Sequence, residues 1–201
     1  EIVEMDASKN VVWKYDAGRR NGNEGKRVEV HAFQRLANGN TMIVESGPAR
    51  IIEVNNAGEI QKTVPLKVER PNSHTDTRLA RKLDNGNYLV AHEGENKVVR
   101  EYDGDGKVVW EYRTGTKVYY AIRLANGNTL LGLGDGHRVI EVDNGGKTVW
   151  SVDEKELPGI TLAWVTMVER LPGGNTLIVN CHGGENNPQL IEIDSDKKVV
   201  W

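Results

Sequence analysis

Two short residue patterns alternate along the whole chain, and this internal repetition constrains the fold more than any other feature. In the first pattern a basic residue and a leucine precede an Asn-Gly-Asn or Gly-Gly-Asn turn, and β-prone residues follow it. Strand-forming residues on both sides of a glycine-containing turn are typical of a β-hairpin, because such turns need φ angles that glycine adopts easily. The pattern begins four times, at Arg35, Lys82, Arg123 and Arg170.

The second pattern opens with alternating apolar and polar residues and bends at an Asp or Asn. It ends seven residues after the bend, at a tryptophan in four of five copies. Alternation before the bend and valine-rich residues after it predict a second hairpin, with Asp, Asn and Gly making the turn. The copies run from Ile2 to Trp13, Ile51 to Lys62, Val99 to Trp110, Val139 to Trp150 and Leu190 to Trp201.

Together the two hairpins form one four-stranded unit. The turn residues of the first pattern stand at positions 38, 85, 126 and 173, so the unit repeats after 47, 41 and 47 residues. A four-stranded repeat with a period of about 40 to 50 residues is typical of a β-propeller blade. The sequence therefore predicts an all-β chain in which residues 1–201 form a single propeller domain of four-stranded antiparallel blades.

The register of the two patterns also predicts blade boundaries. We expect the outer half of one blade at residues 1–15 and four full blades at about 28–64, 74–112, 118–152 and 163–201. Four and a half blades cannot close a ring, and open edge strands invite aggregation, so we expect the chain to be part of a longer protein. The acidic segment 151–159 contains Pro158 and predicts a loop or a single helical turn.

The segment from Asp103 to Trp110, repeated from Asp143 to Trp150, resembles the tryptophan-docking motif of quinoprotein propellers but lacks the Ala and Thr usual there. Over its whole length the chain is similar to bacterial quinoprotein-like repeat propellers of unassigned function. That resemblance implies six blades in the complete protein. It does not carry the quinone over, and we expect no cofactor. The stretches that begin at His31 and His74 are also similar to inner strands of arylsulfotransferase-like propellers.

Composition excludes several kinds of partner. With 26 Lys and Arg against 29 Asp and Glu, the formal charge of -3 provides no basic field for nucleic acid. No apolar run approaches the about 20 residues that span a bilayer. A lone Cys181 excludes an internal disulfide and a cysteine-based zinc cage. We expect a soluble chain of unknown compartment, periplasmic or secreted if a signal peptide precedes it.

The connections between strands differ in character on the two sides of the predicted propeller. Turns within the hairpins are short and uniform, whereas the other connections vary in length and contain or adjoin all five histidines. Variable loops on a rigid scaffold commonly carry binding sites. We expect a polar mouth at the entrances of the inner strands that binds a ligand, lined by His31, His74, Arg78, Tyr119, Tyr120 and Trp164.

Three functions remain open. The leading hypothesis is a non-catalytic recognition propeller that binds a small polar ligand, such as a carbohydrate, or a partner protein. The alternative is an arylsulfotransferase-like or related transferase, in which His31 or His74 is nucleophile or base, Asp76 orients it and Arg78 stabilises negative charge. The third is a purely structural scaffold. No residue spacing predicts a metal site.

The repeated charged and aromatic residues have a structural interpretation. The four basic residues before the turns predict ion pairs with carboxylates of neighbouring blades, such as Glu53, Glu101, Glu141 and Glu192, because unpaired buried cations are costly. The tryptophans at the ends of the second pattern recur once per blade. We expect Trp110 and Trp150 to be largely buried between blades.

Overall fold

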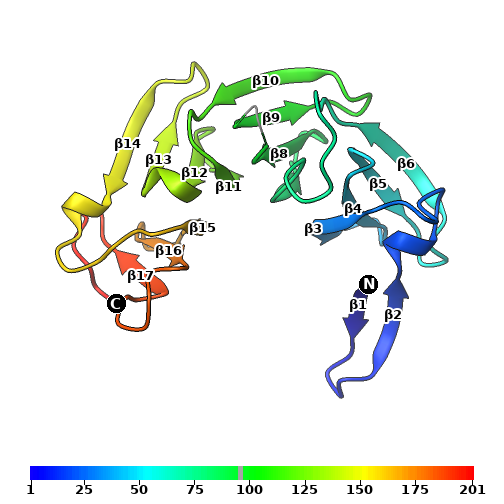
Figure 1. Ribbon diagram of the computed structural model, residues 1–201, viewed down its shortest axis with the longest axis horizontal. Coiled ribbons are helices and arrows are strands. Elements are labelled where there is room, and N and C mark those ends of the chain that lie inside the picture. The colour runs from blue at the N-terminus through cyan, green and yellow to red at the C-terminus, as the bar shows by residue number, and fades with distance from the viewer. Residues whose placement is uncertain (95–96) are drawn as a thin grey trace.

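The computed structural model describes residues 1–94 and 97–201, and these residues form five antiparallel sheets that follow one another around an arc (Figure 1). The predicted β-propeller of four-stranded antiparallel blades is confirmed. The first sheet has two strands, β1 (Ile2–Met5) and β2 (Val11–Tyr15). The N- and C-termini lie near the two ends of the arc (Figure 1).

Three sheets of four strands come next, each in sequential order. Their strands are β3 (Glu29–Arg35), β4 (Thr41–Ser46), β5 (Arg50–Val54) and β6 (Ile60–Pro65); β7 (Ala80–Lys82), β8 (Tyr88–His92), β9 (Val98–Tyr102) and β10 (Val108–Arg113); and β11 (Val118–Arg123), β12 (Thr129–Leu133), β13 (Arg138–Val142) and β14 (Thr148–Asp153). Short 3₁₀ turns occur at η1 (Ala17–Arg19), η2 (Gly134–Gly136) and η3 (Glu154–Glu156). The turn η3 falls within the segment where a loop or single helical turn was expected.

The last sheet has three strands, β15 (Val165–Arg170), β16 (Thr176–Asn180) and β17 (Leu190–Ile193). The expected fourth strand, ending at Trp201, is not a regular strand. This segment pairs with β17 at one isolated antiparallel bridge, between Ile193 and Val199. The backbone N–H groups of Val200 and Trp201 both donate to the Glu192 carbonyl, at 2.9 and 3.4 Å, so one acceptor replaces the successive acceptors of a ladder.

The first hairpin of each full blade closes in the same way. In the turn before β4, Leu36 N–H donates to Asn40 O and Gly39 N–H donates to Leu36 O, at 2.9 and 3.0 Å. Gly39 has φ of 84°, and its counterparts Gly86, Gly127 and Gly174 have 86°, 87° and 91°. A side chain is strained in this left-handed region, so glycine fixes the turn and the register of both strands.

The hydrophobic core lies between blades rather than within one. Strands β4, β8 and β12 are buried along their whole length. One cluster joins Met42 and Ile51 of the first full blade to Tyr88 and Tyr102 of the next, all with no exposed surface. The three four-stranded sheets bury both faces against neighbours, which explains the apolar character of these central strands.

The predicted ion pairs between blades are confirmed for Glu53, Glu101 and Glu141, whereas Glu192 in the last sheet accepts a hydrogen bond from the side-chain amide of Asn175. Lys82 Nζ lies 2.5 Å from Glu53, Arg123 Nη2 lies 2.7 Å from Glu101 and Arg170 Nη2 lies 2.8 Å from Glu141. Each carboxylate belongs to the preceding blade, so the pairs bind successive sheets together. Arg35 makes the equivalent pair with Glu4.

The tryptophans contact the same arginines. The guanidinium carbons of Arg123 and Arg170 lie 4.8 Å from the ring centroids of Trp110 and Trp150. The Trp110 indole N–H also donates to Asn144 O of the next blade, at 3.0 Å. The tryptophans therefore pack between blades, but the expectation that they are largely buried is wrong, because both are only half-buried. Each ring lies against the arginine of an ion pair and packs on the edge of a hydrophobic cluster.

Among the described residues, none of the helical segments has the length and apolar character that a membrane-crossing helix needs.

Candidate functional site

The innermost strands of the last four blades share an irregularity at one position. The strand register shifts by one residue at His31 in β3, Tyr119 in β11 and Thr166 in β15. In the second full blade Arg78 N–H donates to Ala91 O while Ala91 N–H donates to Leu79 O, so two residues again face one. Each irregularity lies four residues before the repeated basic residue. Bulges of this kind redirect a side chain out of the ladder and are common beside functional sites.

A second set of equivalent positions lies two residues earlier. It consists of Glu29, Asp76, Lys117 and Trp164, at or just before the start of each innermost strand. These strands line the concave side of the arc (Figure 1). The two sets therefore place four different pairs of side chains around the inner rim of successive blades.

We call His31, Arg78, Tyr119 and Trp164 the inner row, because they form a continuous chain of contacts across four blades. Arg78 Nη1 lies 3.3 Å from His31 Nε2, and its guanidinium carbon lies 4.5 Å from the Tyr119 ring centroid. The Tyr119 and Trp164 rings meet edge to face at 5.5 Å. Arg78 is buried, whereas the other three are half-buried, so the row presents surface on the concave side.

At one end of the row, His31 and His74 share the carboxylate of Glu29. The Glu29 Oε2 atom lies 2.8 Å from His74 Nδ1 and 3.3 Å from His31 Nε2. The two rings are perpendicular at 5.7 Å. The hydrogen bond from His74 holds the pKa of Glu29 below its usual range, so this carboxylate is ionised at neutral pH.

The orientation of His31 follows from its backbone contact. Its Nδ1 lies 2.8 Å from the Thr77 carbonyl. A carbonyl only accepts hydrogen bonds, so Nδ1 donates, and Nε2 accepts from Arg78 when Nε2 carries no proton. Both nitrogens of this histidine are therefore engaged.

In the middle of the row, two cations surround one buried carboxylate. Glu93 is 3% exposed; its Oε2 accepts from Arg78 Nε at 2.5 Å and its Oε1 lies 3.1 Å from Lys117 Nζ. Among the described residues, two positive groups contact this one negative group, which leaves an excess positive charge at this point of the rim. Because Lys117 is 40% exposed, that charge is accessible to a ligand.

The other end of the row is aromatic. Trp164 contacts the Tyr119 ring, and its ring centroid lies 6.3 Å from that of His182 and 5.2 Å from Lys117 Nζ. Gly134 underlies the pair: a Cβ atom there would lie 3.2 to 3.3 Å from atoms of both Trp164 and Tyr119. The absence of a side chain at this glycine allows the two rings to approach the backbone closely.

Of the predicted ligand-binding residues, the structure brings together His31, His74, Arg78, Tyr119 and Trp164, but not Tyr120. Tyr120 is 9% exposed and belongs to a hydrophobic cluster with Leu130 and Val165. Because Tyr119 is the extra residue of the bulge, its two neighbours Val118 and Tyr120 resume the ordinary pairing. Tyr120 consequently packs between blades.

Of the four residues of the transferase hypothesis, His31, His74 and Arg78 lie together. In the part of the chain that the structure describes, the carboxylate of Asp76 makes no hydrogen bond to any of their side chains. Asp76 accepts backbone hydrogen bonds from Asn72 at 2.7 Å and Gly47 at 3.1 Å, and it is 4% exposed. Burial raises its pKa. The carboxylate thus ties two loops together rather than orienting His31 or His74, whose partner is Glu29.

Sequence reasoning missed Glu29, Glu93 and Lys117. The signal for two of them was available, since Glu29 and Lys117 stand at the same distance from the repeated basic residue as Trp164. Glu93 has no counterpart in that alignment. Its importance follows from its contacts with residues of two different blades.

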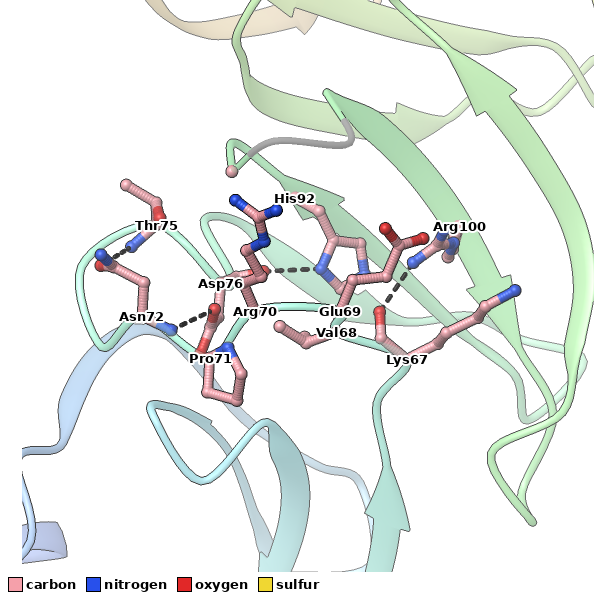
Figure 2. A pocket seen from close by; sticks show the side chains of 11 residues that line it. Lys67, Val68, Glu69, Arg70, Pro71, Asn72, Thr75, Asp76, His92 and Arg100 are labelled. Atoms are coloured by element: carbon pink, nitrogen blue, oxygen red, sulfur yellow. Dashed lines mark hydrogen bonds between the residues drawn. The ribbon is translucent and has the colours of Figure 1, made fainter.

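A cavity of about 270 Å³ lies beside the β6–β7 connection (Figure 2). Its lining includes Lys67, Asn72, Asp76, His92 and Arg100. Arg100 is 1% exposed; it donates to the Lys67 carbonyl at 2.7 Å and pairs with Glu111 at the same distance. His92 Nδ1 donates to Asp76 O at 2.6 Å. These contacts hold the connection that carries His74 and Arg78.

A model of the PQQ-like repeat family, described as outer membrane protein assembly factor BamB, matches residues 1–201. This chain belongs to that family. The predicted resemblance to quinoprotein-like repeat propellers is thereby confirmed. The likeness to arylsulfotransferases rests only on the His31 and His74 stretches. No curated protein matches the chain.

Solved structures similar to this PQQ-like propeller support the same fold. A protein of unknown function from Bacteroides caccae is 26% identical with a TM-score of 0.80, and the match covers 98% of this chain and 72% of that one. A catalytically inactive virginiamycin B lyase from Staphylococcus aureus with quinupristin is 12% identical with a TM-score of 0.66, covering 98% and 60%.

A further match is the extracellular domain of a putative hybrid two component system from B. thetaiotaomicron, at 15% identity and a TM-score of 0.62, covering 89% of this chain and 25% of that one. At these identities the lyase and the extracellular domain show the fold alone.

Proposed function

We propose that the inner row recognises a small polar ligand of the carbohydrate class without chemical turnover. The observation that carries this proposal is the contact chain from His31 through Arg78 and Tyr119 to Trp164. It joins the bulge residues of three successive blades to Trp164, which stands two residues before the bulge of the next blade. Residues repeated for structure would be the same in every blade, whereas these differ.

The chemistry of the row suits a sugar ring. The half-buried indole of Trp164 and the phenol of Tyr119 offer an aromatic surface for the apolar face of a pyranose, and they meet at 5.5 Å. Lys117, whose side chain is 40% exposed, offers N–H donors for hydroxyl or carboxylate oxygens beside that surface, whereas Arg78 is buried and contributes its positive charge. The excess positive charge around Glu93 favours a sugar that carries an acidic group, such as a uronic acid.

A binding role also agrees with the state of His31. A nucleophile or general base needs a free lone pair within hydrogen-bond reach of the group it activates. In His31 one nitrogen donates to Thr77 O and the other accepts from Arg78. A transferase would have to break the hydrogen bond from Arg78 before His31 could react. A partner protein, if it bound here, would need to cover the same concave rim.

For location, we propose a periplasmic or secreted chain. The support is the family description, which refers to outer membrane assembly, and the extracellular-domain neighbour. Fractionation of the native host cell tests this directly. Recovery of the protein with cytoplasmic markers would overturn it.

The ligand proposal is tested in the full-length protein by screening an array of neutral and acidic oligosaccharides and measuring hits by calorimetry. Trp164→Ala should weaken binding of a hit by about 5- to 150-fold, if the ring contributes to sugar stacking the about 1 to 3 kcal/mol that aromatic side chains contribute to stacking on nucleic-acid bases. Phe33→Ala is the matched control, since Phe33 is an exposed aromatic residue of β3 outside the inner row. It should bind like wild type.

Three results would contradict the proposal. Equal losses in the Trp164 and Phe33 variants would mean that the row is not the site. Turnover of an aryl sulfate or another donor, abolished by His31→Ala, would favour the transferase alternative instead. If no sugar binds, and an identified protein binds the wild type but not the Trp164 variant, the ligand would be a protein instead of a carbohydrate.

A further inference from the structure

We propose that Glu29, His31 and His74 form a binding site for a divalent transition metal ion, with Zn²⁺ as the reference ion. This inference does not depend on the carbohydrate proposal, because it concerns one end of the rim and a different class of ligand. The residues come from two blades: Glu29 and His31 lie on β3, and His74 lies in the β6–β7 connection. Their separation in sequence explains why no local spacing predicts the site.

The three donor atoms already lie close together. One ligand atom from each residue falls within 4.8 Å of the other two. The Glu29 Oε2 atom lies 2.8 Å from His74 Nδ1 and 3.3 Å from His31 Nε2. Ligand atoms bound tetrahedrally to Zn²⁺ at 2.0 to 2.1 Å are separated by about 3.3 Å, so small side-chain rotations suffice to bind the ion.

The ring of His31 is also oriented as a metal ligand requires. Histidine ligands nearly always donate their second ring N–H to a carbonyl or carboxylate, which fixes the tautomer and aims the free nitrogen at the ion. His31 Nδ1 donates to Thr77 O at 2.8 Å, which leaves Nε2 facing Glu29. The backbone of the neighbouring blade thus supplies the outer support before any ion binds.

The nearest cation is compatible with this site. Arg78 Nη1 lies 3.3 Å from His31 Nε2, and a metal ion would take the lone pair that now accepts this hydrogen bond. The charge of Arg78 is balanced by Glu93, whose Oε2 lies 2.5 Å from Arg78 Nε. The guanidinium therefore keeps its ion pair when it gives up the weaker bond to His31.

The donor set indicates the class of ion. Two imidazoles and one carboxylate suit zinc and its neighbours in the first transition row, whereas Mg²⁺ and Ca²⁺ prefer oxygen ligands. Three protein ligands leave a coordination position open. His74 is 59% exposed and Glu29 28% exposed at the side chain, so ions reach the cluster from solvent.

The test is titration of the full-length protein, purified without a histidine tag and treated with chelator, with Zn²⁺ by calorimetry and with Co²⁺ by visible absorption. We expect one ion per chain, undisturbed by excess Mg²⁺ or Ca²⁺. The Co²⁺ spectrum should lack a thiolate charge-transfer band, because the cluster contains no cysteine. His74→Ala and Glu29→Gln should each weaken binding by at least about tenfold, since losing even an outer-shell partner costs 10- to 100-fold.

His182→Ala is the matched control, because His182 is an exposed histidine of the same rim that lies beside Trp164. It should leave the metal affinity unchanged. The proposal is overturned if no stoichiometric binding occurs, if His182→Ala weakens binding as much as His74→Ala, or if a thiolate band assigns the ion to Cys181. His74→Ala removes an exposed side chain, and the circular dichroism spectrum of the variant should match that of the wild type.

Discussion

The ion-paired junctions between blades, on the side of the hairpin turns, and the inner rim both recur at fixed positions in the repeat. Residue types are the same from blade to blade at the junctions and differ at the rim. At the junctions the same residue types recur: a basic side chain, a glutamate of the preceding blade and, at three of four junctions, a tryptophan. At the bulges of the rim stand four different residues, His31, Arg78, Tyr119 and Thr166. Equal residues at equal positions indicate a shared structural task, whereas different residues there indicate freedom to serve a ligand.

The largest effect should come from the junctions. Glu101 pairs with Arg123 at 2.7 Å and accepts from the side-chain amides of Asn85 and Asn87, at 3.2 and 2.7 Å. Glu101→Ala leaves the half-buried cation unpaired, so the free energy of unfolding should fall by about 3 to 5 kcal/mol. Chemical denaturation measures this change. A loss below about 1 kcal/mol, the value of an exposed ion pair, would contradict the interpretation that these pairs stabilise the contacts between blades.

A pH-dependent effect of similar size should come from the support of the rim. Full burial lowers the pKa of His92 to about 4, against about 6.5 in an unfolded chain. Between these values the unfolded state binds a proton that the folded state does not. Stability is therefore complete above pH 6.5 and falls as the pH drops, by about 3 kcal/mol at pH 4.

The matched variant for this effect is His92→Gln, which keeps a donor for Asp76 O and an acceptor for the Tyr102 hydroxyl. Denaturation curves at pH 7 and pH 4.5 should show a smaller acid loss in the variant than in wild type. Equal losses would assign the acid sensitivity to other groups.

A smaller loss should follow Trp110→Ala. If Trp110 were fully buried, removing its ring would lower the free energy of unfolding by about 3 to 5 kcal/mol. Trp110 is only half-buried and lies against Arg123 of the ion pair with Glu101, so we expect about 2 kcal/mol. Thermal unfolding measures the loss, and binding of any rim ligand should persist in the folded variant. A loss of ligand binding with unchanged stability would instead make the junction tryptophans part of a site.

The smallest effect should occur at the bulge that carries no charged or aromatic side chain. Thr166 is half-buried, and its hydroxyl donates to Val179 O at 3.3 Å, a long hydrogen bond. Thr166→Ala should change the free energy of unfolding by no more than about 0.5 kcal/mol, as at surface positions without special contacts. A loss above about 1.5 kcal/mol in denaturant titration would show that the bulge residues themselves stabilise the sheet.

The sequence predicts the blades well because their determinants are local. The Asn-Gly turn, the alternation after Ile51 and the glycine at 39 act within about ten residues, and the ion pairs follow from repeating them. The rim is different, because its contacts join residues from separate blades. The bond between Glu29 and His74 spans 45 residues, and the bulge that turns Tyr119 rather than Tyr120 to the rim depends on pairing with β12.

The inserted residue at each bulge has a consequence for how such a protein changes over time. Since that residue stands outside the ladder, replacing it leaves the pairing of its neighbours intact. When a blade is copied by gene duplication, the residue at this position can therefore be substituted without disturbing the sheet. Four such positions, each on its own blade, can carry different side chains on the concave side while the sheets keep the same strand pairing.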